Sequence, residues 1–281
     1  MELAYFADEI EKEDFEAAVK QGVEAGATGV ELRGGIWGER VQQIDDDTVK
    51  RVQDVLAKYG VKIYSIGSPV GKCDYDNAEE RDEHHRMFDR MIELAHAFDT
   101  NIIRGFSLWN PRIKAEGLER YERNTLRPDL DTYMDTVVEF LTPIVQKASA
   151  SGVTLSMENE GATVAGTCVE ARRVADALDA ASGTPDGFTF CYDVVNGVHC
   201  GEAYGPEGYA LLKGRITHLH VKPNDDKEIF PIMGTEDATY DDLIKTLLAD
   251  GYTGVASIEH WGSPELMLKG VRQLREILDR L

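Results

Sequence analysis

Apolar and polar positions along the chain repeat in one order: an amphipathic helical pattern, a glycine, and then a short run of apolar and β-branched residues. Residues 153–160 are the clearest example. They follow a helical pattern at residues 130–150 and Gly152, and their apolar positions are those of a buried strand. The glycine suits a helix C-terminus, where a left-handed backbone conformation is common. The run ends in two carboxylates, Glu158 and Glu160, which share one face of the strand.

The chain contains eight strand–helix units. Strands are predicted at residues 3–7, 29–33, 61–66, 101–106, 153–160, 188–193, 216–222 and 255–259. Eight strand–helix units with no linker between them predict an α/β fold, a single parallel eight-stranded (β/α)8 TIM barrel over residues 1–281. An open Rossmann-like sheet is the alternative, and it is disfavoured because no Gly-x-Gly-x-x-Gly motif follows the first strand.

One polar stretch, residues 109–129, interrupts this order after the fourth strand. It contains Pro111 and Pro128 and has no helical or strand periodicity. Because loops of this length in a compact domain usually serve a function, we predict a lid over the barrel here.

Four consecutive strands end on side chains of the types that can act as metal ligands. The carboxyl ends of parallel barrel strands meet at one mouth, so these side chains are expected to converge. They are Glu158, Asp193, His220 and Glu259. Three carboxylates and one imidazole suit Mn²⁺, Mg²⁺ or Co²⁺ better than a thiolate-preferring ion, and Zn²⁺ also accepts them. We therefore predict one divalent metal ion. The alternative is four separate polar strand ends held by hydrogen bonds or ion pairs, and it is disfavoured because uncompensated buried charge is costly.

Composition limits the partners of the protein. The chain has 30 Lys and Arg against 51 Asp and Glu, a net charge of −21. This charge repels nucleic-acid phosphates and anionic membranes, so we expect neither as a partner. Two explanations of the acidity stay open: an ordinary acidic enzyme, and adaptation to a high-salt habitat.

The sequence also bears on location. Its four cysteines have no paired spacing, which favours a reducing compartment. The first residues lack a basic segment followed by an apolar signal run, and no apolar stretch is long enough to span a bilayer. We expect a cytoplasmic protein.

Several motifs at the strand ends recur together in one known family. The main ones are Val30-Glu31-Leu32-Arg33, Ser156-Met157-Glu158-Asn159, Tyr192-Asp193-Val194-Val195-Asn196, His218-Leu219-His220-Val221-Lys222 and Ser257-Ile258-Glu259-His260-Trp261. Through them, over nearly its whole length, the chain resembles the xylose isomerase-like TIM-barrel superfamily of sugar and sugar-phosphate isomerases and epimerases. This set of motifs is specific for the superfamily and poorly specific for the substrate.

The resemblance implies a divalent-metal-dependent isomerase or epimerase of a sugar, sugar phosphate or polyol-derived ketone. It places the metal, with Mn²⁺ as the first choice, on the same four strand-end residues. It also implies that Glu158 and Glu259 exchange protons with the substrate through an enediolate. Relatives are often dimers or tetramers, so a homo-oligomer is a further implication by analogy. Two departures concern the substrate: Glu160 and Asn196 stand where many members carry His.

Other strand-end side chains are candidates for binding substrate, each with a simpler alternative. Arg33 and Glu31 either serve substrate binding, with Arg33 clamping an anionic group, or form an ion pair under the barrel mouth. The others either face the pocket or only pack or stay solvated: Arg104, His218, Lys222 and Trp261. His199 is expected on a loop after Asn196, and His84 and His85 on a helix surface.

Three other functions compete with the isomerase. The principal one is a metal-dependent lyase on the same scaffold, either dehydroshikimate dehydratase-like or cleaving a C-glycoside or 3-keto-glycoside. An apurinic endonuclease is disfavoured because the chain has only 7 His and no basic excess for a DNA-binding face. A non-catalytic binding protein is disfavoured by the intact ligand set.

Overall fold

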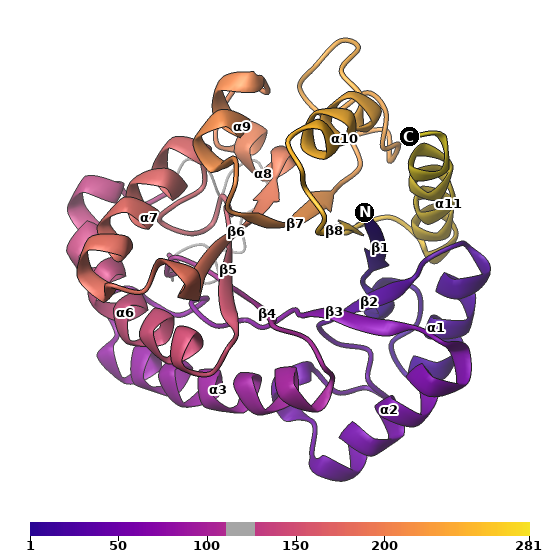
Figure 1. Cartoon of the computed structure of the whole chain (residues 1–281), viewed down its shortest axis with the longest axis horizontal. Helices are drawn as coiled ribbons and strands as arrows, with labels where there is room; N and C mark the ends of the chain where they lie inside the picture. The colour runs from indigo at the N-terminus through magenta and orange to yellow at the C-terminus, as the bar shows by residue number, and fades with distance from the viewer. Residues whose placement is uncertain (111–126) are drawn as a thin grey trace.

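Eight parallel strands form the centre of the molecule in a computed structural model that describes residues 1–110 and 127–281 (Figure 1). They are β1 (Glu2–Tyr5), β2 (Gly29–Leu32), β3 (Lys62–Ile66), β4 (Ile102–Gly105), β5 (Thr154–Glu158), β6 (Phe188–Asp193), β7 (Ile216–Val221) and β8 (Val255–Ile258). Their order is β1-β8-β7-β6-β5-β4-β3-β2, and a parallel bridge between Phe6 and Glu31 joins the two ends. The predicted TIM barrel is therefore confirmed, as a nearly closed barrel.

Helices lie outside the ring of strands (Figure 1). They are α1 (Phe15–Glu24), α2 (Asp46–Tyr59), α3 (Ala78–Ala97), α6 (Leu130–Ala150), α7 (Cys168–Ser182), α8 (Val194–His199), α9 (Pro206–Leu212), α10 (Tyr240–Ala249) and α11 (Pro264–Arg280), with short 3-10 turns at Ala7–Glu9, Val41–Gln43 and Pro185–Gly187. Many begin at a side chain that accepts a hydrogen bond from the first turn, such as Asp45 before α2. The helix α2 ends at Gly60, whose φ of 66° is the left-handed conformation expected there.

Three expectations from the sequence need comment. The prediction that His199 lies on a loop after Asn196 is wrong, because both residues lie in α8. His84 and His85 are not plain surface residues: the His84 ring accepts a hydrogen bond from the Gly71 backbone, and the His85 ring contacts the Phe140 carbonyl and stacks on its ring. Most of the predicted lid at 109–129 lies outside the described residues.

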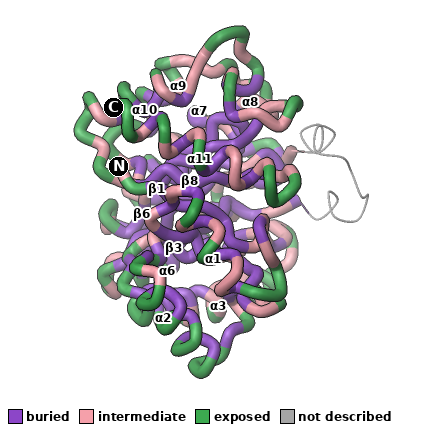
Figure 2. Tube along the Cα trace, turned by 90° about the vertical axis from the view of Figure 1, so that its right-hand side faces the viewer, coloured by how far each residue is buried: buried purple, intermediate pink, exposed green. Residues whose placement is uncertain are grey.

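Buried residues gather along the strands, with exposed residues on the outer helices and turns (Figure 2). In β7, His218 and His220 alternate with Leu219 and Val221, so the two pairs face opposite sides of the barrel wall. All four are buried. The interior near the mouth is thus polar and needs partners for its charges. Within the described part of the chain, no helix has both the length and the apolar composition that crossing a membrane requires.

Candidate metal centre and active site

The side chains of Glu158, Asp193, His220 and Glu259 meet at the carboxyl ends of β5 to β8. One donor atom from each lies within 4.8 Å of the others. His220 Nδ1 is 3.4 Å from Glu158 Oε1, 3.6 Å from Asp193 Oδ2 and 3.8 Å from Glu259 Oε2. Three of the residues are buried, and the Glu259 side chain is 19% exposed. The cluster therefore opens to solvent on the side of Glu259.

A cation lies within this cluster. The Lys222 ammonium is 2.6 Å from Asp193 Oδ2, 2.9 Å from Glu259 Oε2 and 3.4 Å from Glu158 Oε1. It stands in for the positive charge that three converging carboxylates require. Carboxylate oxygens with a single imidazole are the donors that hard divalent cations prefer. The residues present therefore fit one divalent metal ion, which would compete with the Lys222 ammonium for the same oxygens.

The electrostatics of the cluster keep its glutamates ionised. Burial raises the pKa of Glu158, but the charges of His220 and Lys222 outweigh burial and bring this pKa well below the usual value. Burial also raises the pKa of Glu259, and Lys222 and Arg33 more than offset it, so its pKa is lowered as well. Both carboxylates are thus in the form that binds a cation or accepts a proton.

Two arginines hold the outer oxygens of these glutamates. Arg33 Nη1 donates to Glu259 Oε1 at 2.7 Å, and Arg104 Nη1 lies 3.3 Å from Glu158 Oε2. The other oxygen of each glutamate faces the cluster. Each carboxylate is therefore fixed between a guanidinium and the cluster, which sets its orientation without a contribution from substrate.

Asn159, which the sequence analysis did not single out, connects two of the strand ends. Its side-chain amide donates to the Asp193 carbonyl at 2.7 Å and accepts from the Asp193 N–H at 2.8 Å. Asp193 in turn uses Oδ1 to cap α8 through the Asn196 N–H, which leaves Oδ2 for the cluster. The signal in the sequence was a polar residue directly after Glu158. The structure shows that this residue is buried.

Glu9 was also missed. It lies in the 3-10 turn after β1, where Oε1 contacts Arg33 Nη2 at 3.1 Å and Oε2 accepts from the His260 N–H at 2.5 Å. Burial raises the pKa of Glu9 to about 8, Arg33 opposes this rise, and the charge of Glu259 adds to it. A carboxyl group that can hold a proton near neutral pH thus lies on the wall of the site.

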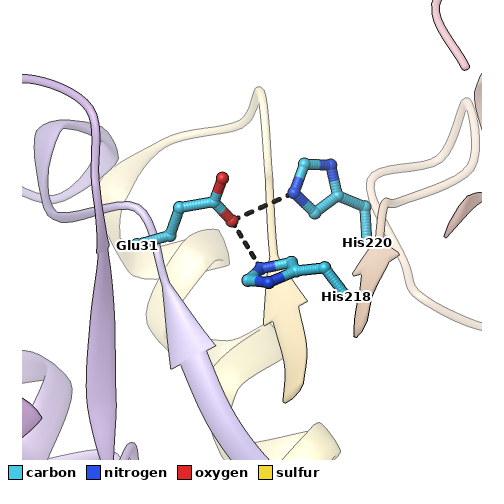
Figure 3. Close-up of side chains that lie close together, drawn as sticks. All are labelled: Glu31, His218 and His220. Carbon is cyan, nitrogen blue, oxygen red and sulfur yellow. Dashed lines mark hydrogen bonds and ion pairs between the residues drawn. The ribbon is translucent and has the colours of Figure 1, made fainter. Parts of the chain in front are cut away.

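The candidate substrate-binding residues fall into three groups. A pocket of about 310 Å³ is lined by four of them, Glu160, Asn196, Lys222 and Trp261, together with Glu259 and Lys72. A second pocket of about 460 Å³ shares Lys72 and is lined by Arg33 and Arg104. Glu31 and His218 line neither pocket, and Glu31 contacts the rings of both His218 and His220 (Figure 3).

Asn196 and Glu160 differ in how they relate to the cluster. The Asn196 amide donates to Glu158 Oε1 at 2.9 Å, and its oxygen is 3.1 Å from Lys222 Nζ. Glu160 instead pairs with Lys72 at 3.3 Å, and Lys72 lies over the Phe106 ring. Asn196 thus acts on the cluster directly, whereas Glu160 belongs to the pocket wall.

A parallel barrel with converging acidic and imidazole side chains at its C-terminal mouth is typical of TIM-barrel enzymes that use this mouth for chemistry. Residues 19–277 match the family model described as xylose isomerase-like TIM barrel, and the chain belongs to this family. No protein of curated function matches the sequence significantly.

Several solved structures share the fold. A xylose isomerase-like TIM barrel protein from Mycobacterium smegmatis in complex with magnesium is 18% identical, with a TM-score of 0.72 and 99% of this chain and 96% of that chain covered. A D-psicose 3-epimerase crystallised in the presence of D-fructose is 15% identical, with a TM-score of 0.72 and 100% and 98% covered. The probable 3-DHS dehydratase AsbF from Bacillus anthracis is 15% identical, with a TM-score of 0.71 and 98% of each chain covered. At these identities the similarity shows the fold alone.

Proposed function

We propose that the protein is a divalent-metal-dependent isomerase or epimerase of a sugar, sugar phosphate or polyol-derived ketone. One observation carries the proposal: Glu158 and Glu259 each contact the Lys222 ammonium with one oxygen, while an arginine holds the other oxygen. Two ionised carboxylates around one position suit removal of a proton from a carbon and its return.

The chain's own residues supply the binding and the proton transfer. Glu158, Asp193, His220 and Glu259 would hold the divalent ion, which when bound polarises a carbonyl and its neighbouring hydroxyl and so acidifies the adjoining C–H. One glutamate takes the proton from that carbon, and the electron pair moves into the bond toward the carbonyl carbon to give an enediolate. The second glutamate takes the proton of the neighbouring hydroxyl and returns it to the carbon, and the first glutamate gives its proton to the oxygen, so that both carboxylates end ionised. Asn196 and Arg104 keep Glu158 oriented during this exchange.

Metal removal tests the proposal. Protein stripped with a chelator is expected to lose proton exchange between D₂O and the C–H beside the carbonyl of its ketose substrate, and Mn²⁺ should restore it. The measurement is mass or NMR analysis of a panel of neutral and phosphorylated ketoses and polyol-derived ketones. Circular dichroism of the stripped protein is the control for folding. Absence of metal-dependent exchange on every compound would contradict the proposal.

A lyase is the second candidate, because the dehydratase from Bacillus anthracis superposes about as well as the epimerase. It would use the same base to remove the proton, after which a hydroxyl or an aglycone leaves from the neighbouring carbon. The products separate the two reactions: a stereoisomer or aldose–ketose pair indicates the isomerase, and an unsaturated product or free aglycone indicates the lyase.

Lys222→Met is expected to bind Mn²⁺ about tenfold more tightly, because the ammonium no longer competes for the three carboxylates. The same change should destabilise the metal-free protein by about 3 kcal/mol, since it leaves these charges without their nearest cation. Titration calorimetry and urea unfolding measure the two effects. Lys72→Met, on the pocket wall, is the matched control. Unchanged or weaker Mn²⁺ binding in Lys222→Met would show that the ammonium does not hold the metal position.

A further inference from the structure

Below the strand-end cluster lies a second group of buried polar side chains, Glu31 from β2 with His218 and His220 from β7 (Figure 3). Glu31 Oε2 forms a hydrogen bond with His220 Nε2 at 3.0 Å and lies 2.7 Å from His218 Nε2. All three residues are at most 1% exposed. Since Glu31 lines neither pocket described above, its buried charge needs an explanation other than contact with substrate.

The two nitrogens of the His220 ring face different partners. Nε2 faces Glu31, and Nδ1 faces Glu158, Asp193 and Glu259. An ionised carboxylate only accepts hydrogen bonds, so the Nε2 atom that contacts it must carry the hydrogen. A ring that binds a metal ion is neutral: it has lost the second proton of the charged ring, keeps one N–H, and has a lone pair on its other nitrogen. The contact with Glu31 therefore directs the lone pair of Nδ1 into the cluster.

Two further contacts support a fixed position for this pair. Arg104 Nη1 is 3.6 Å from Glu31 Oε1 and 3.3 Å from Glu158 Oε2, so one guanidinium connects the deeper carboxylate to the cluster. The Phe6 ring packs edge-on against the His220 ring, with a centroid distance of 5.5 Å. The imidazole is thus restrained by packing as well as by its hydrogen bond.

We propose that Glu31 is a positioning residue that holds His220 with Nε2–H toward itself, so that Nδ1 is the nitrogen available to the divalent ion. The proposal rests on the metal centre of the proposed function. Carboxylates that orient a metal-binding histidine in this way typically contribute about 10- to 100-fold to metal affinity. His218 contacts the same oxygen of Glu31 but does not face the cluster, so it is expected to contribute much less.

The direct test needs no variant. The full-length protein labelled with nitrogen-15 histidine is titrated with cadmium-113, a diamagnetic probe whose coupling identifies the nitrogen that it binds. Coupling to Nδ1 of His220 together with a protonated Nε2 is expected. Coupling to Nε2 would overturn the inference. The signals of His220 are assigned from their loss in His220→Asn.

Variants give a second readout. Glu31→Gln keeps the shape of the side chain but removes its charge, and we expect its Mn²⁺ affinity in calorimetry to fall about 10- to 100-fold. Glu31→Asp should recover part of the loss, and His218→Asn should bind within about threefold of the unmodified protein. A melting temperature that falls while the Mn²⁺ affinity is unchanged would make the role of Glu31 merely structural and overturn the inference. If the unmodified protein binds neither Mn²⁺ nor Cd²⁺, the metal centre itself fails, which is a distinct outcome.

Discussion

Glu259→Gln is expected to lower kcat for the conversion of substrate by about a thousandfold, because a positioned general base contributes roughly 10²- to 10⁴-fold. The amide that replaces the carboxylate cannot take a proton from carbon. The Glu259 oxygen that would bind the metal lies 2.9 Å from the Lys222 ammonium, which occupies the metal position. Metal affinity should therefore fall too, and the comparison must be made at saturating Mn²⁺. Turnover that stays within tenfold of the unmodified enzyme under this condition would exclude Glu259 as base.

Glu160→Gln is the matched control. Glu160 belongs to the same pocket and carries the same charge, but its partner is Lys72 at 3.3 Å and not the cluster. Its loss is expected to change KM more than kcat. A thousandfold loss of kcat in both variants would indicate a general effect of negative charge in the pocket.

A second observation distinguishes two bases from one. If Glu158 and Glu259 act on opposite faces of the substrate, Glu259→Gln should still exchange the proton of the one stereoisomer whose C–H faces Glu158. It should not convert that stereoisomer into the other. Complete loss of exchange from both stereoisomers would instead assign both transfers to Glu259.

The barrel and the convergence of its strand ends were predictable because both follow from local sequence. The strands were indicated by apolar runs, most of which follow a helical pattern and a glycine. Parallel strands in a barrel bring their carboxyl ends together. This rule alone predicts that four strand-end side chains lie close together: Glu158, Asp193, His220 and Glu259.

The roles of the surrounding residues depend on contacts that sequence spacing does not show. Arg33 and Glu259 are 226 residues apart, and nothing local indicates that the guanidinium holds the outer oxygen of this carboxylate. Glu31 is on the same strand face as Arg33 but lies too deep in the barrel to line either pocket. This depth depends on the register between neighbouring strands, which the sequence does not show. The short helix α8 was missed because six residues that include Gly197 and two adjacent valines give no helical periodicity.

Arg33→Met is expected to have a large effect on stability. The guanidinium contacts Asp8, Glu9 and Glu259 and lies over the Phe6 ring, with 25% of its side chain exposed. Removing one partner of a buried ion pair costs about 3 to 5 kcal/mol, and partial exposure favours the lower end of this range. We therefore expect about 3 kcal/mol less stability in urea unfolding at neutral pH, equivalent to a melting temperature lower by roughly 5 to 10 °C.

The pH dependence of this deficit separates charge from packing. Arg33 lowers the pKa values of Glu9 and Glu259, so without it burial and mutual repulsion raise both pKa values in the folded protein, and a raised carboxyl pKa means that stability is lost as pH rises through it. The deficit relative to the unmodified protein should therefore be larger at about pH 8 than at about pH 5. Arg90→Met is the control, because Arg90 pairs with Asp46 and Glu93 at the surface, and such pairs contribute only about 0 to 1 kcal/mol. A deficit of the same size at both pH values would assign the loss to packing on Phe6. A deficit no larger than that of Arg90→Met would mean that the carboxylates at the mouth do not depend on this guanidinium.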